Sequence, residues 1–247
     1  MFTRLGSFGG GSLDGGALSL MYHKLGPRPR GVRLKGLYVP SRLFQQQLED
    51  LQRAGYRSVS MEGLVSSTDA RRVALTFDDG FVNVLAHGLD PLRESGFHAI
   101  QFLVSDLLGK TNVWEQQQGE VSELLMDVGQ VREWMAAGHG IGAHTRTHPW
   151  LTRIPLAEAR EEIFGSKARL EDLFGHPVRH FCYPYGDWNP AVRDLVYEAG
   201  FVTACTTDPG LNRPGGDPFR LRRLTARYAS RNWANIRRML RRWLGKG

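Results

Sequence analysis

The amino-acid sequence predicts an α/β fold with a mostly parallel sheet, built as a closed or partly closed (β/α) barrel. Short runs of β-branched and apolar residues alternate with helical patterns along the 247 residues, which is typical of repeated βα units. Six or seven such units suit a barrel better than an open sheet. Neither nucleotide-binding fingerprint, GxGxxG or GxxxxGK[ST], follows a strand. One domain is expected, since single barrels reach this length.

The expected strands are short and apolar, and they lie at residues 17–22, 71–77, 98–104, 140–144, 178–183, 201–206 and 219–224. Amphipathic spacing predicts helices at residues 41–54, 83–95, 121–137, 156–173 and 190–199. Ser41 is the expected N-cap of the first helix, which ends before Gly55. In either type of parallel sheet, chemistry is expected at the carboxyl ends of the strands.

The chain divides by composition into a glycine-rich, flexible segment at 1–16, a domain at 17–230 and a basic amphipathic helix at 231–247. Hydrophobic residues make up 41% and charged residues 23%, as in globular proteins. No apolar run approaches the roughly 18 residues of a membrane span, and the start does not read as a signal peptide. The expected location is therefore cytoplasmic, with peripheral membrane contact as an additional hypothesis.

The net charge of +7 matches the seven basic residues between 227 and 247, a stretch with no acid. The remainder is neutral overall, so the charge does not indicate a nucleic-acid partner. The last helix would gather apolar residues on one face, namely Trp233, Ile236, Leu240, Trp243 and Leu244. Such a helix either docks on the barrel or lies on an anionic membrane. Cys182 and Cys205 form neither a disulfide framework nor a CxxC signature, and buried thiols are expected.

Two carboxylates, Asp78 and Asp79, follow directly after an apolar strand and precede Gly80. Adjacent side chains point in different directions, so one carboxylate can bind a cation while the other accepts a proton. The alternative is that the Asp-Gly pair is ordinary turn chemistry or caps the next helix.

A second strand end carries His144 and His148 in the segment HTRTHP. Pro149 disfavours a helix at His148, whereas a fully extended strand would separate the two α-carbons by about 13 Å. The segment must therefore turn sharply after His144 if both imidazoles are to bind one ion. Taken singly, each histidine could equally be a satisfied surface or core residue.

One carboxylate and two histidines make a three-ligand set with open positions, the pattern of catalytic metal sites. Zinc is the expected metal, and a His₂-carboxylate set also suits Co²⁺, Ni²⁺ or Fe²⁺. A third strand end carries YPYG at 183–186, where Pro184 and Gly186 favour a rigid loop that exposes the backbone amide of Tyr185 as an oxyanion donor. Packing of this loop on the barrel rim is the alternative.

These motifs together resemble the polysaccharide deacetylases, the NodB-like domain of carbohydrate esterase family 4. The segments TFDDG at 76–80, HTRTH at 144–148 and YPYG at 183–186 match the family's first three motifs in order. The resemblance extends from about residue 17 to 225, and it implies a distorted (β/α)7 barrel. It also implies that Asp78 is the general base, that Asp79, His144 and His148 are the metal ligands, and that the Tyr185 amide stabilises the oxyanion.

The chain departs from the family pattern in two places. No late histidine is present to protonate the leaving amine, because the last histidine is His180. The opening LMYHKLG resembles a permuted subgroup acting on poly-N-acetylglucosamine-type polymers, which makes His23 the candidate acid; a packed histidine is the alternative. Cys182 stands where the family has an arginine that tunes the catalytic aspartate. Arg223 is the candidate substitute for that arginine, and it is also a candidate substrate-binding residue.

The sequence thus predicts a metal-dependent deacetylase of an N-acetylated glycan or glycolipid. Trp188, just after YPYG, is a candidate contact for a sugar face, with rim packing as the alternative. An O-acetyl (xylan-type) esterase and a cyclic imide hydrolase would use the same fold and metal chemistry. A catalytically silent carbohydrate-binding module would not need to retain base and ligands. A non-haem iron oxygenase would share the ligands, but its usual scaffold is antiparallel.

Overall fold

A computed structural model describes residues 16–66, 69 and 71–226. The predicted flexible segment 1–16, apart from its last residue, and the predicted basic helix 231–247 lie outside the described residues, as does any membrane contact of that helix. Among the described residues, no helix is both long and apolar enough to cross a membrane.

The central sheet is parallel and contains eight strands: seven follow the order β10-β1-β5-β6-β7-β8-β9, and the eighth, β4, pairs with β5. The strands are β1 (Leu18–Tyr22), β4 (Arg57–Ser58), β5 (Arg72–Phe77), β6 (Ala99–Leu103), β7 (Gly140–Ala143), β8 (His180–Cys182), β9 (Thr203–Cys205) and β10 (Leu224–Thr225). A separate two-stranded sheet pairs β2 (Lys24–Leu25) with β3 (Tyr38–Val39). The parallel order confirms the predicted α/β barrel class.

The segment 221–225 connects the two edges of the sheet. Leu221 bridges to Cys205 of β9, while Leu224 and Thr225 pair with Leu20 and Met21 of β1. Hydrogen bonds from Leu221 to Ala204 and from Thr206 to Leu221 complete the contact with β9. The sheet is therefore curled into a distorted barrel rather than left open.

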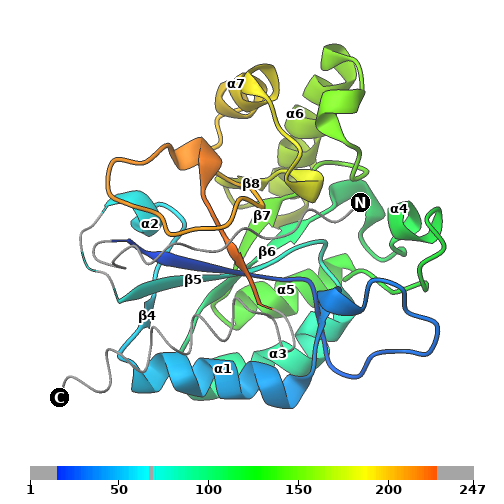
Figure 1. The fold of residues 1–247 in the computed structure, drawn as a ribbon. Helices are drawn as coiled ribbons and strands as arrows, with labels where there is room; N and C mark the ends of the chain where they lie inside the picture. The colour runs from blue at the N-terminus through cyan, green and yellow to red at the C-terminus, as the bar shows by residue number, and fades with distance from the viewer. Residues whose placement is uncertain (1–15, 67–68, 70, 227–247) are drawn as a thin grey trace.

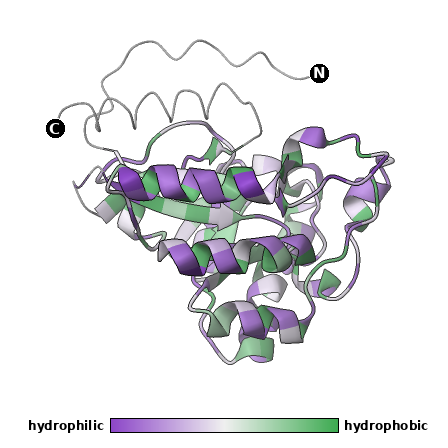
Figure 2. Ribbon diagram, turned by 90° about the horizontal axis from the view of Figure 1, so that it is seen from below, coloured by the Kyte–Doolittle hydropathy of each residue, from purple (hydrophilic) through white to green (hydrophobic). Residues whose placement is uncertain are grey.

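Helices cover the outside of this barrel, with α1, α3 and α5 below the sheet and α6 and α7 above it in Figure 1. They are α1 (Ser41–Arg53), α2 (Gly63–Ser66), α3 (Val82–Ser95), α4 (Val113–Gln116), α5 (Val128–Ala136), α6 (Leu156–Phe174) and α7 (Pro190–Glu198). Seen from below, hydrophilic and hydrophobic residues alternate along the helices (Figure 2), because each buries one face. In α1 that face carries Phe44, Leu48 and Leu51.

Three predicted elements differ from the structure. The helix expected at 121–137 begins only at Val128, because Asp127 caps it in a capping box with Gln130; residues before it form antiparallel bridges instead. The strand expected at 219–224 is a 3-10 turn at Pro218–Arg220 followed by the short β10. Ser41 is the first residue of α1 rather than its cap, which is Pro40.

Candidate metal centre

The carboxyl ends of two strands, β5 and β7, bring the predicted ligands together. Asp79 follows β5, and His144 directly follows β7. His148 lies four residues further on, and all three side chains are buried. One donor atom from each lies within 4.8 Å of the other two. This is the only Asp-His-His group of that kind in the described part of the chain.

The distances from Asp79 to the two imidazoles match those of a tetrahedral metal site. The Nε2 atoms of His144 and His148 lie 3.4 and 3.3 Å from Oδ1 of Asp79. Ligands at about 2.0–2.1 Å from a tetrahedral zinc ion are separated by about 3.3–3.4 Å. Burial alone would raise the pKa of Asp79, but hydrogen bonds with the two imidazoles hold it well below its usual value. The residues present therefore fit a divalent metal.

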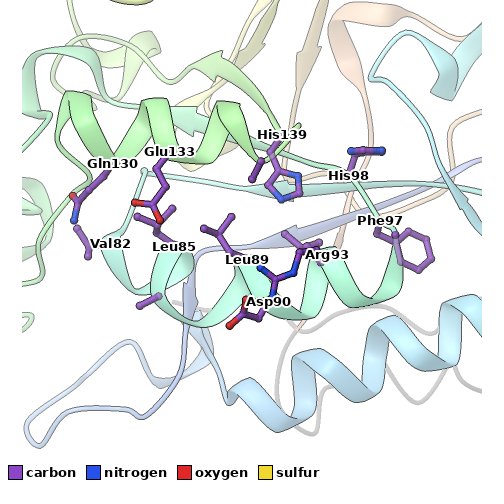
Figure 3. A pocket seen from close by; sticks show the side chains of 14 residues that line it. Val82, Leu85, Leu89, Asp90, Arg93, Phe97, His98, Gln130, Glu133 and His139 are labelled. Carbon is purple, nitrogen blue, oxygen red and sulfur yellow. Dashed lines mark ion pairs between the residues drawn. The ribbon is translucent and has the colours of Figure 1, made fainter.

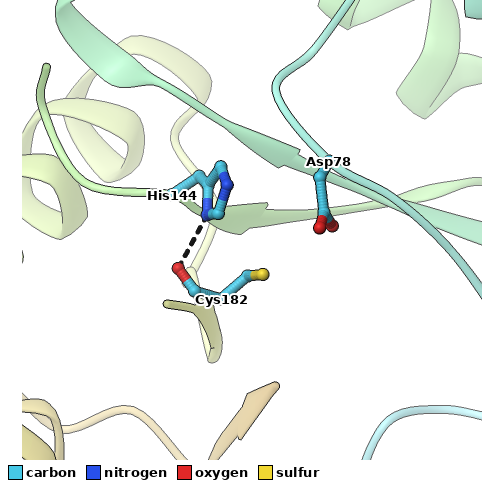
Figure 4. Close-up of side chains that lie close together, drawn as sticks. All are labelled: Asp78, His144 and Cys182. Atoms are coloured by element: carbon cyan, nitrogen blue, oxygen red, sulfur yellow. Dashed lines mark hydrogen bonds between the residues drawn. The ribbon is translucent and has the colours of Figure 1, made fainter. Parts of the chain in front are cut away.

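The two histidines are held in different ways. Nδ1 of His144 lies 2.7 Å from the carbonyl oxygen of Cys182 (Figure 4). That oxygen can only accept, so Nδ1 carries the proton and Nε2 keeps a lone pair for a metal. Nδ1 of His148 is buried and has no hydrogen-bond partner among the described residues. Its ring instead stacks on Trp114, with centroids 4.4 Å apart and planes at 22°.

Unusual backbone conformations cluster at this site. The non-glycine residues with positive φ in the described chain are Asp79, Thr145, His148 and Tyr185, at 76°, 67°, 68° and 59°. Left-handed conformations cost free energy in such residues and persist where surrounding contacts impose them. The amide of His148 donates to Oγ1 of Thr145 at 3.0 Å. The chain thus turns sharply after His144, as its sequence predicts.

A buried ion pair holds Asp78. Arg223 Nη1 lies 2.7 Å from Oδ1 of Asp78, and Nη2 lies 2.8 Å from Oδ2. Arg223 also donates to Thr206 O, Thr76 Oγ1 and Cys182 Sγ. Burial would raise the pKa of Asp78, but the Arg223 guanidinium outweighs it and lowers the pKa below its usual value. Of the two roles predicted for Arg223, the geometry favours that of holding Asp78, since its side chain is 0% exposed and not open to a substrate.

A second group, Asp78, His144 and Cys182, also brings three donors together (Figure 4). It does not suit a metal, because the Arg223 cation already pairs with Asp78 and donates to the Cys182 sulfur. Burial raises the pKa of Cys182 to about 11, so the thiol keeps its proton. Both cysteines are free and buried, as the sequence predicts.

His23 lies beside the same carboxylate from the end of β1. Its Nε2 is 3.8 Å from Oδ2 of Asp78, and its side chain is 18% exposed. Burial lowers the pKa of His23, and the nearby carboxylate of Asp78 opposes this shift. The next residue, Lys24, is fully buried and forms an ion pair of 2.6 Å with Glu115. His23 is therefore near enough to share a reacting group with Asp78.

The YPYG loop lies against His148, and the second tyrosine of the loop, Tyr185, is half-buried. The ring of Tyr185 meets that of His148 edge to face at 4.5 Å and stacks on Trp150 at 3.9 Å. Gly186 has φ of 71°, and a Cβ there would lie 2.1 Å from Oγ1 of Thr207. Only glycine fits this close approach, so the loop and the Tyr185 amide are fixed in place.

The ring of Trp188 packs against neighbouring side chains, so it does not present two open faces to a sugar. The guanidinium of Arg220 lies 4.3 Å from its ring centroid, and the ring of Tyr183 lies 6.4 Å away. The sequence gives no signal for three further residues near the site, Trp114, Trp150 and Glu115, because none belongs to a recognisable motif. Their positions depend on loops that only the folded chain brings together.

A groove between α3 and α5 lies elsewhere on the barrel (Figure 3). His98 and His139 line it, and they precede β6 and β7 respectively. The groove therefore lies at the amino ends of the strands, whereas the group of Asp79, His144 and His148 lies at their carboxyl ends. Burial lowers the pKa of His139 to about 4, which keeps this imidazole neutral.

Comparisons with known proteins agree with this geometry. A family model described as polysaccharide deacetylase matches residues 66–204. The chain is 25% identical over 171 residues to the peptidoglycan-N-acetylglucosamine deacetylase PgdA of Listeria monocytogenes, covering 69% of this chain and 32% of that protein. It is 30% identical over 159 residues to the chitooligosaccharide deacetylase of Bradyrhizobium sp. (strain ANU 289), covering 63% and 64%.

The fold also matches a solved structure, that of IcaB from Ammonifex degensii. The TM-score is 0.78 at 24% identity, and the match covers 92% of this chain and 97% of that one. Since the family model spans more than half of the chain, the protein belongs to the polysaccharide deacetylase family. The chain spans less than two thirds of the length of the two curated relatives.

Proposed function

We propose that this protein is a metal-dependent deacetylase that hydrolyses the N-acetyl group of a GlcNAc-containing glycan or lipid-linked sugar. The observation that carries the proposal is the convergence of one donor atom each from Asp79, His144 and His148 within 4.8 Å, next to the paired carboxylate of Asp78. The names of two relatives, a peptidoglycan-N-acetylglucosamine deacetylase and a chitooligosaccharide deacetylase, support this substrate class.

A divalent cation held by the three ligands supplies a Lewis acid that polarises the acetyl carbonyl and favours ionisation of water. Zinc is the proposed metal, because the donor spacing and the nitrogen-rich ligand set suit it; Co²⁺ and Ni²⁺ are accepted by similar donors. The hydrogen bond from Nδ1 of His144 to the carbonyl oxygen of Cys182 fixes the imidazole tautomer, which leaves Nε2 available to bind the metal.

Asp78 accepts the proton from the attacking water. Arg223 fixes the carboxylate by one hydrogen bond to each oxygen, and each oxygen keeps a further lone pair. The low pKa that results keeps Asp78 ionised and ready to accept a proton at neutral pH. The Asp78 base is thereby oriented before substrate binds.

Two further groups act on the oxygen and the nitrogen of the amide. The backbone N–H of Tyr185 donates to the carbonyl oxygen as it gains negative charge, and Gly186 holds that segment in place. The protonated form of His23, which the neighbouring Asp78 carboxylate favours, gives a proton to the leaving amine nitrogen from a position 3.8 Å from Asp78. A base for the attacking water and an acid for the leaving amine are what amide hydrolysis requires.

Acetate release from a panel of substrates tests the proposal. Zinc-loaded protein is compared on chitooligosaccharides, poly-N-acetylglucosamine, lipid-linked GlcNAc and acetylxylan, with Asp78→Asn as the control. Release from the GlcNAc compounds, lost in the control, is expected. Release only from acetylxylan would favour an O-acetyl esterase. Ring opening of a cyclic imide, assayed separately, without acetate release from any compound of the panel would favour an imide hydrolase. Either result would contradict N-deacetylation.

A further inference from the structure

Trp114 stands out among the residues around the metal cluster because it covers one of the ligands. Its ring lies nearly parallel to that of His148, with centroids 4.4 Å apart and planes at 22°. Trp114 is itself 7% exposed, so the contact is internal. It belongs to no motif that the sequence presents, and the steps proposed above do not use it.

His148 lacks the support that metal-binding histidines ordinarily have. Such a ligand donates its second ring N–H to a carboxylate, carbonyl or water, and that bond fixes the orientation of the ring. His144 has this bond to the carbonyl of Cys182. Nδ1 of His148 has no partner among the described residues, although the atom is buried. Among the described residues, the contacts that orient this ring are therefore aromatic.

Aromatic contacts enclose the His148 ring instead. Trp114 stacks on one face, while Tyr185 and His144 meet the ring edge to face with centroids at 4.5 and 4.8 Å. Of these contacts, that of Trp114 is the only stacked one. Flat stacking fixes the plane of the imidazole, and the edge contacts limit rotation within that plane.

Trp114 can act in this way because its short helix is anchored to the barrel. The neighbouring Glu115 is buried and pairs with Lys24 at 2.6 Å. Asn112 donates to the same carboxylate at 2.6 Å, and its Oδ1 accepts from the amide of Glu123 at 2.7 Å. The Lys24 pair attaches α4 to β2, and the Asn112 bond attaches the start of α4 to Glu123. Trp114 is therefore held by contacts that precede and follow it in the chain.

We infer that Trp114 is a positioning residue for the metal ligand His148, and that its stacked ring takes the place of the missing hydrogen bond to Nδ1. The inference rests on the metal centre of the proposed function and is independent of the substrate. Loss of a partner that orients a ligand costs about 10- to 100-fold in metal affinity. Loss of the flat ring is expected to have a comparable effect.

Zinc affinity of the full chain, measured by competition with a chromogenic chelator, tests the inference. Trp114→Ala and Trp114→Leu are expected to weaken zinc binding by about 10- to 100-fold, whereas Trp114→Phe, which keeps a flat ring, stays near the wild-type value. The Leu variant is the matched control for apolar bulk without a flat face. The visible spectrum of bound Co²⁺ reports the ligand geometry and is expected to change in Ala and Leu but not in Phe.

Unfolding of each variant in excess chelator separates this role from a purely structural one. Wild-type zinc affinity in Trp114→Ala, or equal affinity in the Leu and Phe variants, would overturn the inference. The inference would also be overturned if the loss of zinc affinity across the variants were explained entirely by their lower stability in the metal-free state. Because zinc binding is measured without substrate, failure of the deacetylase proposal would be seen separately, as the absence of acetate release by zinc-loaded wild type.

Discussion

The ion pair between Arg223 and Asp78 allows a quantitative prediction. Arg223 makes five hydrogen bonds, two of them to the Asp78 carboxylate, and both side chains are almost fully buried. Arg223→Met keeps much of the side-chain length but leaves the carboxylate buried without a partner. Breaking a buried pair in this way costs about 3–5 kcal/mol, so the free energy of unfolding is expected to fall by that amount.

Urea unfolding of chelator-treated protein measures this loss, and a double-mutant cycle isolates the pair. Asp78→Asn combined with Arg223→Met is expected to cost about 1–3 kcal/mol less than the sum of the single changes, because the double variant contains no unpaired charge. The exposed neighbour Arg222 supplies the matched control, and Arg222→Met should change stability by no more than about 0.5 kcal/mol. Additive single changes, or equal losses at positions 222 and 223, would refute the reasoning.

Two further predictions concern His23 and Glu120. His23→Ala should lower turnover by about 10²- to 10⁴-fold with bound zinc unchanged by elemental analysis; unchanged turnover would remove His23 as the acid. Burial would raise the pKa of Glu120, but hydrogen bonds from the backbone amides of Val121, Leu34 and Arg33 lower it below its usual value. The stabilisation is thus present above the unfolded-state pKa of about 4.3 and is lost as the pH falls through the lower folded-state value. Glu120→Gln should therefore lose less stability on acidification, measured by urea midpoints, and parallel curves would contradict this.

The parallel barrel could be predicted from the sequence because each βα unit carries local sequence signals. The apolar run before Asp78 and the glycine that follows each of the five long helices are signals of that kind. The prediction of a helix over 121–127 was wrong for an equally local reason, because the capping box of Asp127 and Gln130 starts α5 later than its apolar spacing indicates. The short β2 and β3 have two residues each and no periodicity to recognise.

The grouping of Asp79, His144 and His148 could also be predicted, because these residues lie within compact motifs. Pro149 disfavours a helix at His148, and binding of one ion by both histidines requires a turn between them. The contact partners of these ligands could not be predicted. Arg223 reaches Asp78 across 145 residues of sequence, through the segment that joins both edges of the barrel. Trp114 meets His148 from α4, which a buried Lys24–Glu115 pair anchors. Such long-range contacts leave no pattern in a single sequence.

Metal removal and return tests the central claim most directly. Protein stripped with chelator should release no acetate from chitooligosaccharides, and activity should return in proportion to added zinc up to one equivalent per chain. Asp79→Ala, which removes one of the three donors, should neither retain zinc through dialysis nor regain activity at that stoichiometry. Full activity in the stripped protein, or restoration of Asp79→Ala by one equivalent of zinc, would contradict the account.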